Sequence, residues 1–237
     1  MKILCLECSA VPCSVAVIED GNIISNAFVN VKCTHSQTLM PLVKSVLESS
    51  MLTLNDIDGF AISKGPGSFT GIRIGISAVK GLAASENKPC VGVSTLSAIA
   101  ENYRDTDCIV CAVMDARCNQ VYNALFKVEN GVISRMCDDR AILCDELAEE
   151  LKQIPHTDKN IIIVGDGTDV FLPFTEGIPN IKKSDIKRRF QNAVGVGMAA
   201  SKEFEKGDTV EPSALLPLYL RLPQAERELN LKRGKEK

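Results

Sequence analysis

The chain has 237 residues, of which 45% are hydrophobic and 24% charged, with a formal net charge of −3. This composition is ordinary for a globular protein, and the slight negative charge excludes a general electrostatic attraction to nucleic acid. No apolar run approaches the roughly 20 residues that span a bilayer, and the chain reaches Glu7 before an apolar signal segment can form. We therefore expect a cytoplasmic protein without a membrane anchor.

The first hundred residues are predicted to form three antiparallel strands, followed by alternating helices and strands. The hydrophobic pattern predicts strands at 2–8, 13–19 and 23–30, a helix over 38–49, a strand at 59–64, a helix over 70–84, a strand at 90–93 and a helix over 95–103. This order is typical of an RNase H-like unit.

The same order then partly repeats. The pattern predicts strands at 108–115, 121–128 and 132–143, a helix over 145–153, a strand at 161–165 and a last helix over 193–204. Two RNase H-like lobes in tandem form the α/β fold of the actin-like ATPase superfamily. We expect an N-terminal lobe at 1–104, a C-terminal lobe at 105–221 and a charged tail at 222–237.

Ten cysteines need an explanation in such a chain. A disulfide framework is not expected without a secretion signal, and a thiol inside an apolar run packs as a small hydrophobic group. Cys5 and Cys8, like Cys108 and Cys111, have CxxC spacing but lie in predicted strands, where residues three apart point to opposite faces. Buried thiols are therefore favoured over metal or redox sites. Cys8 and Cys13 flank a predicted hairpin loop and are the better candidates for reactive thiols.

The segment from Lys64 to Gly75 joins a predicted strand to a predicted helix with the sequence KGPGSFTGIRIG. Pro66 and Gly67 suit a tight turn, and Ser68 or Thr70 can cap the helix. Such a turn points backbone amides at one spot, which suits either an anion or a closely approaching partner. The segment fits neither the Walker A pattern nor the dinucleotide fingerprint.

This segment resembles the signature of the TsaB (YeaZ) family, and three other segments resemble that family in the right order. They are Ile3–Ser9 near the start, Met114–Tyr122 in the middle and Pro217–Arg221 near the end. The resemblance implies an actin-like fold and a role in making N6-threonylcarbamoyladenosine at position 37 of tRNA. It also implies a non-catalytic subunit that docks a TsaD-like catalytic subunit and is joined by a TsaE-like ATPase. Such a subunit contacts tRNA only through the complex, and when alone it is a candidate homodimer.

Catalytic members of the superfamily hold nucleotide phosphates with two loops, which here supply Glu7 with Ser9, and Asp115 with Arg117. TsaB relatives usually have Asp at the position of Glu7. The second loop lacks glycine, so an amide cradle for phosphate is not expected, and the Gly165–Thr168 segment is a weak candidate for adenosine contact. We expect no catalytic residue and no tightly bound cofactor, with ATP or ADP at the subunit interface as a candidate ligand.

Two other functions stay open at this point. The first is an independent ATPase or small-molecule kinase that uses the cleft between the lobes. The second, less favoured, is a metallopeptidase, which needs at least two histidines at a fixed short spacing. The chain has only His35 and His156, so no metal site is expected.

The first two predicted helices carry more apolar residues than one stripe can use, together with small residues one turn apart. Both helices are either deep core or part of a partner interface, and the resemblance favours an interface with the TsaD-like subunit. The interface residues predicted on this basis are Leu39, Leu42, Val43, Val46, Gly71, Ile72, Gly75, Ile76 and Val79.

Overall fold

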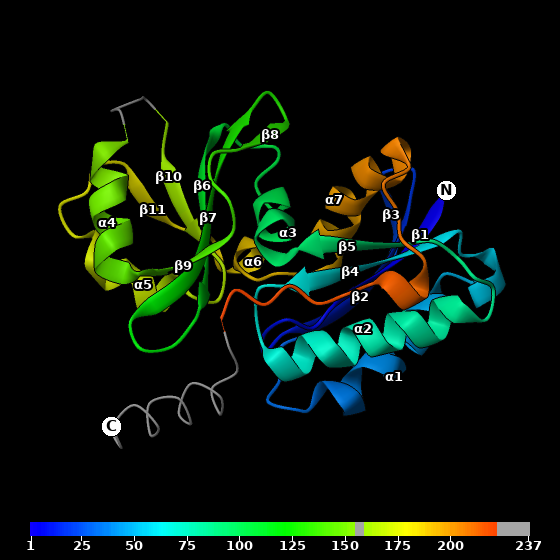
Figure 1. Cartoon of the computed structure of the whole chain (residues 1–237). Coiled ribbons are helices and arrows are strands. Elements are labelled where there is room, and N and C mark those ends of the chain that lie inside the picture. Colours follow the sequence, from blue (N-terminus) through cyan, green and yellow to red (C-terminus); the bar gives the residue numbers. More distant parts are fainter. Residues whose placement is uncertain (155–158, 222–237) are drawn as a thin grey trace, which may run out of the picture.

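A computed structural model describes residues 1–154 and 159–221, which form two mixed sheets with two helices between them (Figure 1). The charged tail predicted at 222–237 and His156 lie outside the described residues. Among the described residues, no helix is long and apolar enough to cross a membrane.

The first sheet has the strand order β3-β2-β1-β4-β5, with β1, β2 and β3 antiparallel and β4 and β5 parallel to β1. Its strands are β1 (Lys2–Glu7), β2 (Cys13–Glu19), β3 (Asn22–Val29), β4 (Gly59–Gly65) and β5 (Cys90–Ser94). Helices α1 (His35–Ser49) and α2 (Phe69–Ala84) cover one face of this sheet (Figure 1).

The second sheet repeats this order as β8-β7-β6-β10-β11, with β9 also paired to β7. Its strands are β6 (Cys108–Asp115), β7 (Gln120–Glu129), β8 (Val132–Arg135), β9 (Arg140–Leu143), β10 (Ile161–Val164) and β11 (Ile181–Lys183). Helix α4 (Cys144–Gln153) packs on its outer face together with α5 (Thr168–Phe171). The repeated order confirms two RNase H-like lobes in tandem.

Some predicted boundaries were wrong. The strand predicted at 132–143 is two strands, because the four residues 136–139 lie opposite only two residues of β7, 124 and 125, which interrupts the regular pairing. Asp139 in this segment accepts a hydrogen bond from Ser94 of the first lobe. The short elements β11 and α6 (Ile186–Arg189) were not predicted, since three or four residues carry too little periodicity. The described residues also form three short 3₁₀ helices: η1 (Leu54–Asp56), η2 (Leu172–Thr175) and η3 (Pro212–Ala214).

Helices α3 (Thr95–Glu101) and α7 (Ala193–Lys206) lie between the sheets (Figure 1). Leu96 and Ile99 of α3 pack against the second sheet, whereas Val196 and Ala200 of α7 pack against the first. The boundary expected near residue 104 therefore separates the two sheets. The segment expected to complete the C-terminal lobe, however, returns to the first sheet, because the apolar face of α7 fits that sheet.

The predicted partner interface needs correction, because most of it lies in the protein's own core. Leu42 is half-buried. The other eight residues are buried on the face of the two helices that packs against the sheet: Leu39, Val43, Val46, Gly71, Ile72, Gly75, Ile76 and Val79. Helix α1 packs on β2 and β3, and α2 packs on β4 and β1, so these buried residues are covered by the chain itself. Of the two alternatives that the sequence left open, deep core or partner interface, these residues belong to the core.

The glycines of the signature segment have an internal role as well. A Cβ at Gly71 would lie 2.1 Å from the Cys8 carbonyl oxygen, and one at Gly75 would lie 2.4 Å from the Cys8 Sγ atom. Ser68 caps α2 by accepting a hydrogen bond from the Gly71 N–H (3.2 Å). The start of α2 is thus pressed against the loop after β1. Its small outward residues lie further along, at Ser77, Gly81 and Ala84.

Candidate interlobe site

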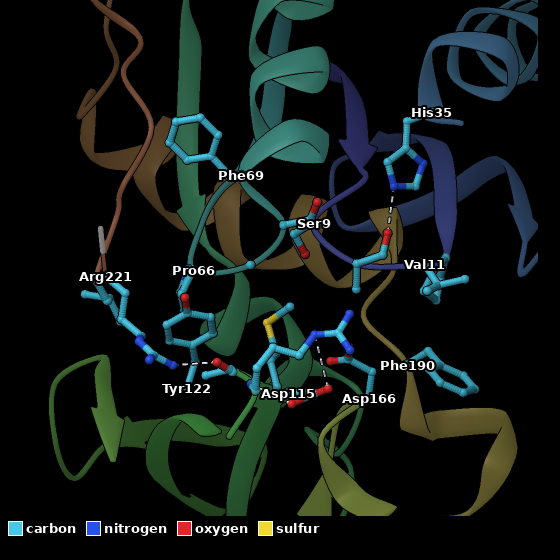
Figure 2. A pocket seen from close by; sticks show the side chains of 18 of the residues that line it. Ser9, Val11, His35, Pro66, Phe69, Asp115, Tyr122, Asp166, Phe190 and Arg221 are labelled. Atoms are coloured by element: carbon cyan, nitrogen blue, oxygen red, sulfur yellow. Dashed lines mark hydrogen bonds and ion pairs between the residues drawn. The ribbon is translucent and has the colours of Figure 1, made fainter. Parts of the chain in front are cut away.

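A cavity of about 870 Å³ lies between the two lobes (Figure 2). Three of the segments that line it follow or end central strands: 9–12 after β1, 114–117 at the end of β6, and Asp166 after β10. Residues 30–33, 66–69 and 218–221 also line it. The first three are the two predicted phosphate loops and the weaker adenosine candidate, so the fold brings all three together. Strands β1 and β6 occupy the same central place in their two sheets, and this symmetry explains why the loops at their ends meet at one cavity.

Glu7 does not point into this cavity. Its side chain is fully buried, and its Oε1 accepts hydrogen bonds from the Ser9 N–H and the Ser9 hydroxyl, both at 2.6 Å. Its Oε2 accepts a hydrogen bond from the Ser63 hydroxyl. Burial raises the pKa of Glu7, although the bonds from Ser63 and Ser9 oppose this. The Glu7 side chain therefore does not face a phosphate in the cavity, whereas Ser9 lines the cavity with its hydroxyl bonded to Glu7. The assignment of Ser9 as a possible phosphate contact stays a prediction.

The loop after β1 is fixed from the outside as well. The Ser9 carbonyl accepts a hydrogen bond from the Ser68 N–H (2.6 Å), and the Ala10 carbonyl accepts one from His35 Nε2 (2.7 Å). Figure 2 shows the imidazole of His35 reaching this loop from the start of α1. His35 thus joins α1 to the loop. Sequence reasoning gave it no site role, since a lone histidine carries no spacing signal.

The loop after β6 does face the cavity. Asp115 is half-buried, and its Oδ1 accepts a hydrogen bond from the Arg117 N–H (2.7 Å), with the Arg117 Nε 3.8 Å from Oδ2. Arg117, Cys118 and Asn119 all have positive φ angles, of 67°, 56° and 54°. Three successive residues other than glycine in the left-handed region are costly. The loop therefore takes, without glycine, a backbone shape that glycine normally supplies.

Asp166 completes the acidic side of the cavity (Figure 2). Burial raises its pKa to about 7, Asp115 adds to the increase, and the Gln191 side chain opposes it. The Gln191 Nε2 lies 3.5 Å from the Asp166 Oδ1. Carboxyl groups with a pKa near neutrality are found in functional clefts, and also among buried groups with a structural role.

The segment 218–221 runs along the cavity and connects the lobes. The Leu218 N–H donates to the Lys64 carbonyl (2.7 Å) in the first lobe, and the Arg221 guanidinium donates to the Ala116 carbonyl in the second. Tyr219 stacks on Phe69 with ring centroids 4.6 Å apart. The sequence marked these residues only through their resemblance to the family's ending, and gave no reason to place them at the cleft.

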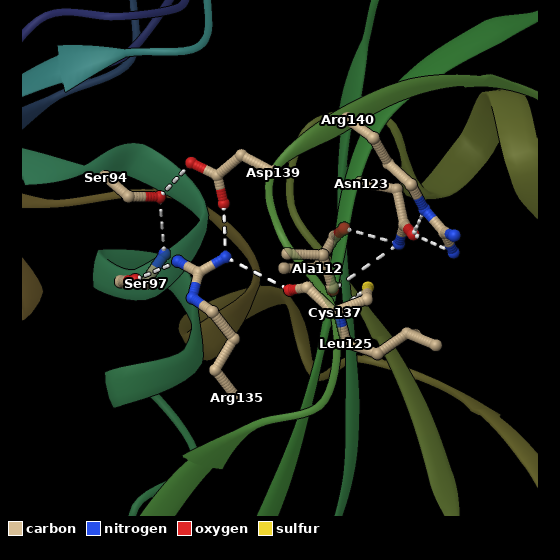
Figure 3. A network of polar contacts seen from close by, with 10 residues as sticks. Ser94, Ser97, Ala112, Asn123, Leu125, Arg135, Cys137, Asp139 and Arg140 are labelled. Carbon is tan, nitrogen blue, oxygen red and sulfur yellow. Dashed lines mark hydrogen bonds and ion pairs between the residues drawn. The ribbon is translucent and has the colours of Figure 1, made fainter. Parts of the chain in front are cut away.

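A second connection between the lobes lies at the start of α3 (Figure 3). Arg135 donates to the Asp139 Oδ1 and to the Ser97 hydroxyl, both at 2.6 Å, and Asp139 accepts from the Ser94 hydroxyl at 2.5 Å. The guanidinium also lies 4.7 Å from the centroid of the Phe126 ring. Together with the segment 218–221, this cluster joins the lobes at two separate places.

The thiols predicted to react are buried. Cys8 and Cys13 are each only 1% exposed, and burial raises the pKa of both, most strongly that of Cys8. A buried, protonated thiol is a poor nucleophile, so this prediction was wrong. Cys5 and Cys111 are buried in the same way, as expected. Within residues 1–154 and 159–221, no three His, Cys, Asp or Glu side chains are placed to hold a metal ion.

Two RNase H-like sheets of the same strand order, with a cleft lined by the loops after their first strands, define a protein of the actin-like fold. Residues 24–228 match the family profile described as "TsaD: tRNA N6-adenosine threonylcarbamoyltransferase". The chain is 30% identical to the TsaB protein of Bacillus subtilis, over 95% of this chain and 96% of that protein. It is 32% identical to TsaB of Escherichia coli, over 97% of this chain and 98% of that protein.

A solved structure of YeaZ from Pseudomonas aeruginosa superimposes with a TM-score of 0.79 at 25% identity, covering 92% of this chain and 99% of that one. The chain belongs to the TsaB (YeaZ) family of tRNA threonylcarbamoyladenosine biosynthesis proteins. The resemblance stated from the sequence is therefore confirmed, as is the actin-like fold.

Proposed function

We propose that this protein is a non-catalytic subunit of a tRNA N6-adenosine threonylcarbamoyltransferase complex. The observation that carries the proposal is the burial of Glu7, whose carboxylate holds the loop after β1 through hydrogen bonds from Ser9 and Ser63 instead of facing the cleft. A loop whose polar side chains are committed to the interior is poorly suited to position a nucleotide and its metal. The protein then acts in the cytoplasm by binding, and the transfer to tRNA takes place on a TsaD-like partner.

The partner surface that we propose is the outward side of α1 and α2. Ser77, Gly81 and Ala84 are exposed at helical spacing on α2, and a Cβ added at Gly81 would meet no atom within 4 Å. Small residues in such a row allow a second helix to approach closely. On α1, Met40 is 45% exposed and supplies apolar area. The buried residues predicted earlier support this surface from beneath.

Binding to the TsaD-like protein of the same organism, measured by calorimetry, tests this proposal. Met40→Glu should weaken binding about tenfold or more, because a charge is desolvated at a helix contact. Met136→Glu is a matched control, since Met136 is 47% exposed on the other lobe. Absence of binding by the unchanged chain, or equal loss in both variants, would contradict the proposed surface.

The complex would also include a TsaE-like ATPase, and tRNA would be contacted only through the assembly. ATP or ADP at the interface with the catalytic subunit is a further element of the proposal. Adding nucleotide to the calorimetric experiment tests it, because a ligand bound at the interface must raise the affinity between the two proteins.

One observation favours a second candidate, an independent ATPase or kinase: the three loops meet around one cavity of about 870 Å³. Hydrolysis of ATP by the isolated chain, lost in Asp115→Ala, would support that function. We expect no such hydrolysis.

A further inference from the structure

Strand β5 forms the edge of the first sheet opposite β3, and a single residue pair covers part of it. Val210 exchanges two hydrogen bonds of 2.9 Å with the backbone of Cys90. Alternate residues of a strand present their N–H and C=O groups to the same edge, so Gly92 faces outward like Cys90. In the part of the chain that the structure describes, β5 pairs with no strand other than β4, and no hydrogen bond reaches the outer side of Gly92. The edge is therefore open immediately beyond Val210.

A groove of about 420 Å³ lies along this open edge. Residues 91–94 of β5 form its floor, Ala199 and Glu203 of α7 line one wall, and residues 214–216 line the other together with Lys64. Figure 1 shows α7 and the segment after η3 on the two sides of β5. Since a strand rises about 3.3 Å per residue, the floor is about 13 Å long and admits an extended segment of about four residues.

The two walls of the groove differ in chemistry. On the α7 side, Glu203 pairs with Lys206 (3.1 Å), and its carbonyl accepts a hydrogen bond from the Asp208 N–H (2.9 Å). Asp208 also lines the groove, is exposed, and forms no ion pair within residues 1–154 and 159–221. On the other side, Leu215 is buried and Leu216 is 67% exposed. One wall therefore attracts a cation, and the other accepts an apolar side chain.

Gly92 determines which side chains of a bound strand would face which wall. A Cβ added at Gly92 would lie 2.9 Å from the Lys64 Cδ atom and 3.1 Å from the Leu215 Cδ1 atom, so this position points at the apolar wall. Residues opposite each other in paired strands point to the same face, and their neighbours point to the other. A residue bound opposite Gly92 would therefore pack on Leu215 and on the methylene groups of Lys64. The residues on both sides of it would face α7.

We propose that the open edge of β5 binds an extended segment of another protein, in which an apolar residue lies between two basic residues. The segment adds antiparallel to β5, which is the direction that Val210 already has on this edge. Its apolar residue exchanges two backbone hydrogen bonds with Gly92 and packs on Leu215, while its basic residues face Glu203 and Asp208. In strand addition of this kind, the backbone bonds provide affinity and the walls provide specificity.

This contact is separate from the partner surface proposed on α1 and α2. Among the described residues, those that line the groove belong to neither of these helices. A partner could therefore occupy the groove while the surface of α1 and α2 is occupied or free. The test below consequently does not depend on the proposed function.

The test titrates the ¹⁵N-labelled chain with the peptide acetyl-GKVKG-amide, up to about 5 mM, and follows the amide signals by nuclear magnetic resonance. The unchanged protein should bind the peptide, with the largest shift at the Gly92 amide. Methylation of the valine nitrogen in the peptide should weaken binding at least about tenfold, because the peptide then cannot donate to the Gly92 carbonyl. Acetyl-GEVEG-amide should also bind at least about tenfold more weakly, because its charges equal those of Glu203 and Asp208.

Charge reversal at the groove provides the decisive variant. Asp208→Lys should weaken binding of the lysine peptide at least about tenfold and strengthen binding of the glutamate peptide. Glu205→Lys is the matched control, since Glu205 is exposed on α7, does not line the groove, and changes the net charge by the same amount. It should leave both affinities within about twofold, because salt screens exposed charges outside the contact. The melting temperature of each variant checks that it folds.

A Gly92 amide that does not shift with the lysine peptide would overturn the proposal. Binding that survives methylation of the valine nitrogen would also overturn it, because no strand is then added to β5. Equal changes in Asp208→Lys and Glu205→Lys would do the same, because the attraction would then be general and not local to the groove. The experiment contains no TsaD-like protein, so its failure leaves the proposed function untouched.

Discussion

Single residues at the cleft have roles that follow from their surroundings more than from their chemical type. Glu7 and Asp166 are both carboxylic acids whose pKa is raised by burial. Glu7 is held by three hydrogen bonds, whereas Asp166 has the amide of Gln191 3.5 Å away. Glu7 is therefore a structural acid, and Asp166 is the carboxyl group at the cavity whose charge depends on pH near neutrality.

Asp166 should make stability depend on pH. Its pKa is about 7 in the folded chain and about 3.9 in an unfolded chain, so its contribution to stability is greatest below pH 4 and is lost as pH rises through 7. Relative to the unchanged chain, Asp166→Asn should have a free energy of unfolding that is about 2–3 kcal/mol more favourable at pH 8 than at pH 5, because each pH unit between 5 and 7 is worth about 1.4 kcal/mol. Urea unfolding at both pH values measures the difference.

Asp169 provides a control for this experiment. Its hydrogen bond with Lys183 lowers the pKa of Asp169, so its contribution has the opposite sign and is present at neutral pH. Asp169→Asn should not increase stability at pH 8. An Asp166→Asn variant with no pH-dependent gain would show that the carboxyl group is not held in an unfavourable environment.

Helix α2 carries small residues on both its buried side and its exposed side. Its first turns carry glycine where the loop after β1 approaches most closely, and its later turns carry small residues on the outside. From their spacing in the sequence, the early glycines and the later small residues of α2 could not be told apart. The structure distinguishes them, because Gly71 and Gly75 lie against Cys8 whereas Gly81 has no atom nearby.

Two alanine substitutions in α2 should have opposite effects on stability. Gly71→Ala should lower the free energy of unfolding by about 3 kcal/mol, because the new Cβ would lie 2.1 Å from a backbone oxygen. Gly81→Ala should raise it by about 0.5–1 kcal/mol, because the Cβ meets open space and alanine favours the helix. Chemical denaturation of both variants measures this. Equal effects would contradict the internal role of Gly71.

At the scale of the whole molecule, the two lobes share their core and are joined at the cleft. Helices α3 and α7 pack on each other between the sheets, and a Cβ at Gly195 of α7 would lie 2.3 Å from the Ala98 carbonyl oxygen of α3. The segment 218–221 and the Arg135 cluster connect the lobes at two further places. The lobes should therefore behave as one cooperative unit.

Calorimetry should show a single unfolding transition for the unchanged chain. Gly195→Ala should lower its melting temperature by about 5 °C or more, because the close contact between α3 and α7 must open. Two resolved transitions in the unchanged chain would contradict this shared core.

The sequence by itself determined the order of strands and helices along the chain, the tandem lobes and the family, because hydrophobic periodicity and the four short motifs are local properties of the chain. It also placed the candidate loops at the ends of the right strands. Only the tertiary structure decided which way side chains point. It turned Glu7 inward and buried Val43 and Ile76 under the sheet. It also brought Arg221 to the carbonyl of Ala116, 105 positions earlier in the chain, and Tyr219 to the same cleft. Burial and long-range contact depend on which elements meet, and no local pattern contains that information.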